Sequence, residues 1–243
     1  MARLNALLRA AAPEPGDLVV IPELWPTGYA RRASLEAATS AHGGRWSSFV
    51  AGIARECGVF IAGSAPHTED DRLTNRLVVY GPSGDSLGFY DKMHLFPPMR
   101  EDELFSAGGK VEAIPLPGSG FVLGPAICYD LRFPELFRLL ALRGATLFVL
   151  PSEFPDPKED LWHVFLASRA AENQAYVVAC NRTGESGAFT FFGSSAVYDP
   201  LGRCLGRLGR EEGYLKVPLD ASEVVRARAS LEVLSRVRLS IGV

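Results

Sequence analysis

Short apolar runs alternate with amphipathic stretches along most of the chain, a pattern typical of an α/β fold. The runs contain few polar residues, as expected for strands that are covered on both faces of a sheet. Strands are therefore predicted at residues 18–22, 59–64, 121–127, 145–150 and 176–179.

Helices are predicted between these strands from apolar spacing and from end signals. Gly58 and Gly144 stand where a helix commonly ends in a left-handed residue. Asp156 and Pro157 resemble a capping residue and a first-turn proline, and the helix that they open would bury Leu161, Val164 and Phe165. The predicted helices are residues 1–13, 45–57, 134–144, one that starts at 156, and one after residue 219.

Hairpin signals add antiparallel strands to this alternation. Residues 77–80 and 87–90 flank a Gly-Pro-Ser-Gly-Asp turn, and two further β segments surround Asp-Pro-Leu-Gly at 199–202. A last strand is predicted at 214–219. The sheets should therefore be mixed. Without an internal repeat or low-complexity linker, the sequence predicts a single domain over residues 1–243.

Composition narrows the function. The chain is 47% hydrophobic and 22% charged, the balance of a globular protein with a sizeable core. Its net charge of −3 offers no positive field for nucleic acid or anionic lipid, and its apolar runs are too short to cross a bilayer. Four scattered cysteines without a CxxC pair indicate neither disulfides nor zinc, and they fit a reducing cytoplasm. Three of them, Cys57, Cys180 and Cys204, are expected to be buried structural thiols.

Candidate chemistry lies where predicted strands end. Cys128 follows a buried strand and precedes a helix, a position that suits a nucleophile, although position alone favours a residue that simply finishes the strand. Glu23 and Lys92 follow two other β segments. Because the carboxyl ends of neighbouring strands converge on one rim of a sheet, the three side chains can meet there. A carboxylate and a cation are what a weakly acidic thiol needs to become a nucleophile.

Three segments resemble the signature segments of the nitrilase superfamily of carbon–nitrogen hydrolases, and they occur in the family's order. They are Pro-Glu-Leu with Thr-Gly-Tyr at 22–24 and 27–29, Tyr-Asp-Lys-Met-His-Leu-Phe at 90–96, and Cys-Tyr-Asp-Leu-Arg-Phe-Pro-Glu at 128–135. A fourth stretch, at 168–177 and 180–184, resembles a later block of the family. The resemblance spans about residues 16–220.

The resemblance implies an αββα sandwich with mixed sheets, no cofactor and no metal. It also implies a catalytic set of Glu23 as general base, Lys92 as oxyanion cation and Cys128 as nucleophile. Amide hydrolysis would then proceed through a thioester with release of ammonia. The family often uses a second glutamate before the nucleophile, for which Glu101 is the best match and Glu103 the runner-up.

Within the superfamily the segments are most similar to the omega-amidase branch, whose substrates, such as 2-oxoglutaramate, carry a carboxylate. Substrate contacts would come from Tyr129, whose backbone N–H faces the oxyanion, and from Glu153 and Phe154. Arg132 either binds the substrate or braces the loop through Glu135 or Asp130. A small-molecule amide and a second copy of the chain are the expected partners, at least as a homodimer.

Two departures and three alternatives accompany this interpretation. The family normally opens with a β-strand before the first helix, so either the sheet lacks this strand or translation starts upstream. The tail after Leu219 also differs from the family's usual ending. The same catalytic trio would serve an N-carbamoyl amide hydrolase or an amidase acting on deaminated glutathione. A catalytically weak interaction module is the alternative from another class.

Overall fold

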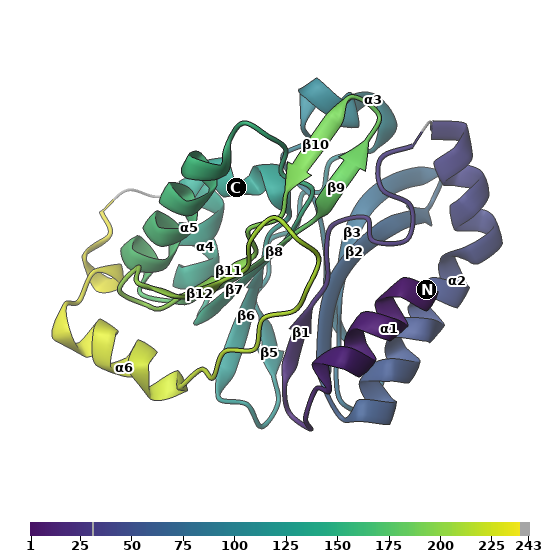
Figure 1. Ribbon diagram of the computed structural model, residues 1–243. Helices are drawn as coiled ribbons and strands as arrows, with labels where there is room; N and C mark the ends of the chain where they lie inside the picture. Colours follow the sequence, from purple (N-terminus) through teal and green to yellow (C-terminus); the bar gives the residue numbers. More distant parts are fainter. Residues whose placement is uncertain (31, 239–243) are drawn as a thin grey trace.

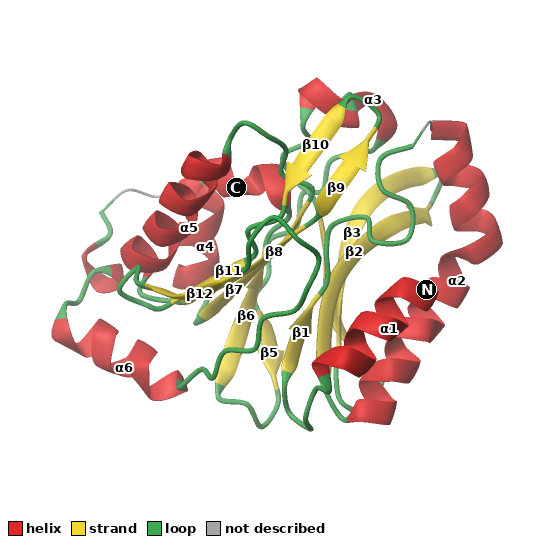
Figure 2. Cartoon of the chain, viewed as in Figure 1, coloured by secondary structure: helices red, strands yellow, loops and turns green. Residues whose placement is uncertain are grey.

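Two β-sheets pack face to face and carry helices on their outer sides, which makes an αββα sandwich (Figures 1 and 2). The computed structural model describes residues 1–30 and 32–238, with the backbone alone for residues 41–43. None of its helices, within these ranges, has the length and apolar character that a membrane span requires.

The first sheet has the order β1-β2-β3-β4, with β1 parallel to β2 and the other neighbours antiparallel. The hairpin predicted around residues 81–85 is confirmed as β3 and β4. The helices α1 and α2 cover the outer face (Figure 1). The bounds are α1 (Ala2–Ala11), β1 (Leu18–Val20), α2 (Arg32–Cys57), β2 (Phe60–Glu69), β3 (Arg72–Tyr80) and β4 (Ser86–Asp91).

The second sheet has the order β12-β11-β8-β7-β6-β5, in which β6, β7 and β8 are parallel and the remaining pairs antiparallel. Both sheets are therefore mixed, as predicted. The bounds are β5 (Ile114–Leu116), β6 (Phe121–Pro125), α4 (Pro134–Leu142), β7 (Leu147–Ser152), α5 (Glu159–Asn173), β8 (Tyr176–Asn181), β11 (Ala196–Tyr198) and β12 (Cys204–Arg207).

Shorter elements complete the chain near the ends of the sheets. A two-stranded hairpin of β9 and β10 stands apart from both sheets (Figure 2). The remaining bounds are η1 (Pro97–Met99), α3 (Glu101–Leu104), η2 (Cys128–Arg132), β9 (Thr183–Ser186), β10 (Phe189–Phe192), α6 (Ala221–Ser230) and η3 (Leu234–Arg236).

The main core lies between the two sheets and beneath α4 and α5. Leu77 and Val79 of β3 and Leu123 and Val149 of the second sheet are completely buried in it. Each such side chain contributes about 1.5–3 kcal/mol through loss of apolar surface to water. This core fixes the two sheets relative to each other, and with them the strand ends at which the polar site is built.

The helix α5 begins later than the sequence predicts. Lys158 is its N-cap and Glu159 its first residue, so the predicted capping role of Asp156 is wrong. Asp156 has other partners, because its N–H donates to the carbonyl of Thr190 and its carboxylate pairs with Arg210.

The predicted buried face of α5 is wrong at Leu161 and Val164, whereas Phe165 is partly buried and packs against the main core. Trp162, Leu166 and Ala170 are completely buried, whereas Leu161 is 44% and Val164 58% exposed. Trp162 decides the orientation, because it buries the largest apolar surface of the helix and its indole N–H finds an acceptor in the Ser194 carbonyl at 3.0 Å.

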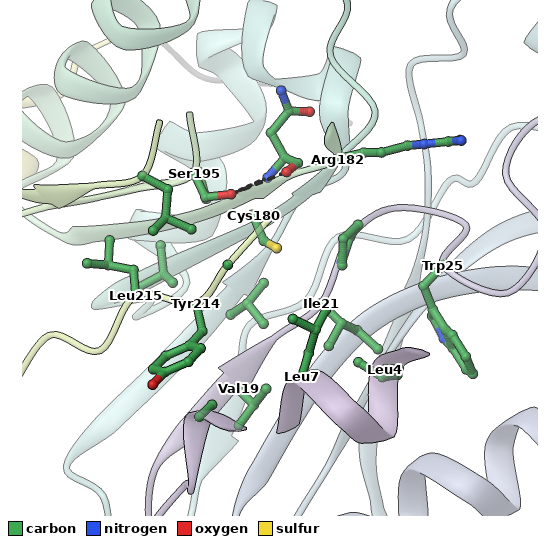
Figure 3. Close-up of a pocket in the computed structure, with 18 of the residues that line it drawn as sticks. Leu4, Leu7, Val19, Ile21, Trp25, Cys180, Arg182, Ser195, Tyr214 and Leu215 are labelled. Atoms are coloured by element: carbon green, nitrogen blue, oxygen red, sulfur yellow. Dashed lines mark hydrogen bonds between the residues drawn. The ribbon is translucent and has the colours of Figure 1, made fainter. Parts of the chain in front are cut away.

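The segment 214–219 is not a strand, contrary to prediction. No other backbone group in the described part of the chain pairs with it, and an unpaired segment cannot form a ladder. It borders a groove of about 990 Å³ between α1 and β1 on one side and β8 on the other, which Figure 3 shows.

Two cysteines depart from the expectation of buried thiols. Cys204 is exposed on β12, and Cys57 is only partly buried.

Candidate active site

Four chemically active side chains from distant parts of the sequence meet in the interior. Glu23 follows β1, Lys92 follows β4, Cys128 stands three residues beyond β6, and Glu101 opens α3. Glu23, Lys92 and Glu101 are completely buried and Cys128 is 4% exposed. Charged groups are rarely buried to this degree unless each is paired, so their partners define the site.

Lys92 is the centre of the cluster. Its Nζ donates to Glu23 Oε1 at 2.8 Å and to Glu101 Oε2 at 2.6 Å. Burial alone would lower the pKa of Lys92, but the two carboxylates outweigh it and raise the pKa above the ordinary lysine value. Lys92 is therefore a fixed cation in a buried site.

Glu23 is saturated with hydrogen-bond donors. Besides Lys92, its Oε1 accepts from the Tyr29 hydroxyl at 2.7 Å and from Asn75 Nδ2 at 2.8 Å. Its Oε2 accepts from the backbone N–H of Glu153 at 2.8 Å. These bonds fix both carboxylate oxygens in position. The roles of Tyr29 and Asn75 were not predicted, and Asn75 gives no local signal because it stands between Thr74 and Arg76 in β3.

Glu101, rather than Glu103, joins the cluster. Its Oε2 also accepts from the Phe96 N–H at 2.8 Å, and its Oε1 from Asn75 at 3.1 Å. Burial raises the pKa of Glu101, and Lys92 opposes this shift. Glu103 is exposed and pairs with Arg100. The short helix α3 thus turns one glutamate inward and the other toward solvent.

Cys128 occupies a strained turn beside this cluster. Its φ is +46°, a left-handed conformation that costs a side-chain-bearing residue about 1–2 kcal/mol. Burial and the negative charges of Glu23 and Glu101 raise the pKa of the thiol well above its ordinary value, and Lys92 only partly opposes them. The resting sulfur is thus a neutral thiol, whose hydrogen bond to Glu23 contributes to the shift.

These groups together can activate a thiol only at the moment of reaction. Two carboxylates and one ammonium leave the cluster with a negative charge, which disfavours a preformed thiolate. A base in contact with the thiol can instead accept its proton as the sulfur attacks. The backbone N–H of Tyr129 has no acceptor in the described part of the chain, so it can donate to an incoming oxygen.

The residues predicted to contact substrate lie around this centre in different settings. The Tyr129 ring packs on Phe96 with ring centroids 5.0 Å apart. The Arg132 guanidinium lies over Phe154 at 6.0 Å and over Phe165 at 5.2 Å. Arg132 forms no ion pair with Glu135 or Asp130 within the described ranges. Phe154 itself is buried in the core against Trp162.

Glu153 is buried beside Glu23, and an arginine balances its charge. Its Oε1 accepts from Arg182 Nη1 at 2.8 Å, while its Oε2 is buried and has no hydrogen-bond partner among the described residues. Burial and the nearby Glu23 raise the pKa of Glu153 to about 7, against the opposing effect of Arg182. Arg182 has no role in the sequence-based interpretation, although it stands in the quoted block 180–184.

The groove of Figure 3 approaches this site from one side. Arg182, Trp25 and Cys180 are labelled in that view, and the lining of the groove reaches Glu23 and Glu153 but not Cys128. Burial raises the pKa of the Cys180 thiol to about 12, so this sulfur is less acidic than an ordinary cysteine. Among the described residues, no group of three or more His, Cys, Asp or Glu side chains is arranged to hold a metal ion.

The sequence of this chain is similar to a known hydrolase family and to proteins that are named as amidases. The sequence model of the carbon–nitrogen hydrolase family matches residues 1–229. The chain is 37% identical to a 2-oxoglutaramate amidase from Bacillus subtilis (strain 168), over 91% of this chain and 85% of that protein. It is 30% identical to omega-amidase NIT2 from Homo sapiens, over 97% of this chain and 88% of that protein.

Solved structures agree with the sequence comparison. A carbon–nitrogen hydrolase from Helicobacter pylori G27 has a TM-score of 0.88 at 25% identity, over 98% of this chain and 87% of that chain. A glutamate-to-glutamine mutant of an amidase from Nesterenkonia sp. AN1, whose structure shows the result of Michael addition of acrylamide at the active site cysteine, has a TM-score of 0.78 at 30% identity, over 89% of this chain and 85% of that chain. Sequence and fold together show that this chain is a member of the carbon–nitrogen hydrolase family and an amide-hydrolysing enzyme.

Proposed function

We propose that the protein is an omega-amidase, which hydrolyses the terminal amide of 2-oxoglutaramate to 2-oxoglutarate and ammonia through a thioester on Cys128. The observation that carries this proposal is the strained Cys128 thiol next to the buried carboxylates of Glu23 and Glu101 and the ammonium of Lys92. The catalytic unit is a single domain that extends over residues 1–243.

Acylation uses Glu23 twice, first as a base and then as an acid. Glu23 removes the thiol proton as the sulfur of Cys128 attacks the amide carbon. Negative charge then develops on the amide oxygen, where the Lys92 ammonium and the Tyr129 N–H stabilise it. Glu23 returns the proton to the leaving nitrogen, and the C–N bond breaks to give ammonia and the thioester.

Deacylation repeats the sequence with water. Glu23 takes a proton from the water that attacks the thioester, and the released thiolate of Cys128 recovers a proton from Glu23. Glu101 holds Lys92 in place and keeps it charged, because its Oε2 lies 2.6 Å from Lys92 Nζ, closer than Glu23 Oε1 at 2.8 Å. Neither half of the cycle needs a further ionisable group.

The charge distribution around the cluster supports a carboxylate-bearing substrate. Arg182 forms an ion pair with Glu153, so the carboxylate of Glu153 does not add an unbalanced negative charge near an anionic substrate. Arg132 is a cation without an ion-pair partner in the described residues, and it follows the nucleophile closely in sequence. We assign the distal carboxylate of the substrate to Arg132, with Tyr129, Glu153 and Phe154 shaping the pocket.

A product-release screen tests the assignment. Ammonia is measured with 2-oxoglutaramate and with an N-carbamoyl amino acid, and 2-oxoglutarate is measured with deaminated glutathione, whose amide nitrogen leaves as a peptide amine. The value of kcat/KM is then compared across the three substrates. The proposal expects the highest value for 2-oxoglutaramate. A higher kcat/KM for either of the other substrates would replace the substrate while leaving the nucleophile in place.

Two variants test the nucleophile in the same screen. Cys128→Ala should abolish ammonia release, whereas Cys180→Ala should retain it, because Cys180 also carries a weakly acidic thiol but lies outside the cluster. Turnover that persists in Cys128→Ala would refute the mechanism. An absence of turnover on every amide by the wild-type enzyme would favour the interaction module.

A second copy of the chain is the proposed partner, and the exposed face of α5 is its contact. Leu161 and Val164 lie side by side on that helix at 44% and 58% exposure. Covering them would remove apolar surface from water, which favours association. Sedimentation should show a homodimer that Val164→Glu converts to a monomer, while a monomeric wild type would refute the contact.

The proposed location is the cytoplasm, because the described cysteines are free thiols and a reducing compartment keeps thiols in that state.

A further inference from the structure

Asp130 is a buried carboxylate that the proposed mechanism does not use, and it accepts from several elements at once. Its Oδ2 accepts from the backbone N–H of Ile127 at 2.9 Å and from the Tyr90 hydroxyl at 2.9 Å. Its Oδ1 accepts from the backbone N–H of His94 at 3.1 Å and lies 2.7 Å from His94 Nδ1. Because a carboxylate only accepts, Nδ1 is the donor in that contact.

Two reciprocal hydrogen bonds between Ile127 and Asp130 close the turn that carries the nucleophile. Asp130 N–H donates to the Ile127 carbonyl at 3.0 Å, while Ile127 N–H donates to the Asp130 side chain. These reciprocal bonds enclose Cys128 and Tyr129. A residue at φ +46° persists only where its surroundings over-determine the conformation, and these bonds supply that constraint.

The bonds from His94 and Tyr90 to Asp130 tie this turn to the segment that carries Lys92. His94 lies two residues after Lys92, and its ring stacks on Phe133, beyond the nucleophile turn, with centroids 3.6 Å apart and planes 7° apart. The Tyr90 hydroxyl donates to Asp130 and accepts from the Met93 N–H at 3.1 Å. The end of β4 and the Cys128 turn therefore share one carboxylate.

We propose that Asp130 is a positioning residue for this reaction, which fixes the Cys128 sulfur relative to Lys92 Nζ and Glu23. The inference rests on the proposed function, since it concerns the same nucleophile. A sulfur that must approach a carbonyl carbon to about 3–3.5 Å tolerates little displacement, and about 1 Å of misplacement can cost about 100-fold in rate.

Asp130→Asn tests this proposal, with Asp199→Asn as the matched control. Asn keeps the shape of the side chain but turns an N–H₂ group toward two of the donors, so the turn must shift. Asp199 is likewise a buried turn carboxylate, which accepts from Leu201 N–H and Arg203 N–H, each at 2.9 Å, but it lies in the β11–β12 turn. Both variants should lose thermal stability, so stability alone does not separate them.

Kinetics and thiol chemistry separate the two variants. In Asp130→Asn, kcat for 2-oxoglutaramate should fall about 100-fold while KM stays near the wild-type value, because geometry is lost rather than substrate binding. The pH profile of Cys128 alkylation by iodoacetamide should also change, because the thiol loses its fixed contact with Glu23. Asp199→Asn should match the wild type in both measurements.

Two further variants decide the matter if Asp130→Asn does not fold. Tyr90→Phe removes one donor to Oδ2 and, with it, the acceptor of the Met93 N–H. His94→Phe removes Nδ1 while retaining a ring to stack on Phe133. Each should lower kcat about tenfold, the effect of one hydrogen bond to a charged group. Wild-type kcat and alkylation profiles in both, or in a folded Asp130→Asn, would overturn the proposal. If Cys128→Ala remained active, the proposed function would fail instead.

Discussion

Replacing Lys92 by Met should destabilise the protein and inactivate it through one cause, the loss of a buried positive charge. Lys92 Nζ lies 2.6 Å from Glu101 Oε2 and 2.8 Å from Glu23 Oε1, and all three side chains are completely buried. Methionine fills nearly the same space without the charge. The variant therefore leaves two neighbouring carboxylates in the interior with no cation between them.

The magnitude follows from these distances. At an effective dielectric constant of about 20, charges about 2.7 Å apart attract by about 6 kcal/mol for each contact. Much of this is offset, because the ammonium no longer has to be desolvated. The net loss expected on removing one partner of a buried ion pair is about 3–5 kcal/mol. Activity should fall by about 100–1,000-fold, as expected when an oxyanion donor is removed.

The stability loss of Lys92→Met should depend on pH, and the pKa of the remaining carboxyls determines in which direction. Without Lys92, burial and mutual repulsion raise the pKa of a carboxyl in the pair, as burial already does for Glu101. A carboxyl whose pKa is higher in the folded than in the unfolded state stabilises the fold at low pH. That contribution is lost as the pH rises through the folded-state pKa. The stability deficit of Lys92→Met should therefore be smaller at pH 5 than at pH 8.

Urea unfolding at the two pH values, read against the wild type, measures the deficit. Lys92→Met/Glu101→Gln is the matched control, because it restores the single net negative charge of the wild-type cluster. It should recover much of the stability and none of the activity. A Lys92→Met protein with wild-type stability at pH 8, or with a deficit independent of pH, would refute the reasoning about the buried charge.

Two further predictions concern Glu153 and its surroundings. The raised pKa of Glu153, about 7, means that this carboxyl lowers stability by about 3 kcal/mol as the pH rises from about 4.5 past 7. Urea unfolding of Glu153→Gln should show a flatter dependence of stability on pH than the wild type, and an unchanged slope would contradict the assignment. Gly28→Ala should cost more stability than Gly187→Ala, by about 1 kcal/mol. Both glycines have φ near +60°, but only at Gly28 would a Cβ meet Arg182, at 2.9 Å, and disturb its pair with Glu153. Equal melting temperatures for the two variants would contradict this.

The sequence predicts most strands of the two sheets because their signals are local, although it misses β5, β9 and β10 and wrongly places a strand at 214–219. Apolar runs and turn residues led to β1, β6, β7 and β8 and to the β3–β4 hairpin. The position of Glu23, Lys92 and Cys128 at strand ends also explains why distant residues meet, since those ends share one rim. What the sequence predicts less well depends on partners that come from elsewhere in the chain.

The helix α5 shows how such partners decide. Asp156 has the chemistry of a helix cap, but Thr190 and Arg210 engage it instead. Leu161, Val164 and Phe165 have helical spacing, yet the neighbouring stripe through Trp162 buries more surface and faces the sheet. Periodicity defines a face only to within about one position, and the tertiary contacts choose between adjacent faces.

The polar support of the site was the hardest part to predict. Asn75 donates to Glu23 and to Glu101, and Tyr29 donates to Glu23, yet each is an ordinary residue of its local pattern. Their roles arise only when β3 and the loop after β1 come together around Lys92. Burial then forces every charged group to find partners, and these two residues supply them.

A rapid-quench experiment tests the central claim most directly. Wild-type enzyme is mixed with 2-oxoglutaramate, quenched in acid within the first turnovers, and analysed by intact-protein and peptide mass spectrometry. The account predicts a 2-oxoglutaryl adduct that maps to Cys128 and is absent from Cys128→Ala. Ammonia release with the acyl group on another residue, or undiminished release by Cys128→Ala, would contradict it.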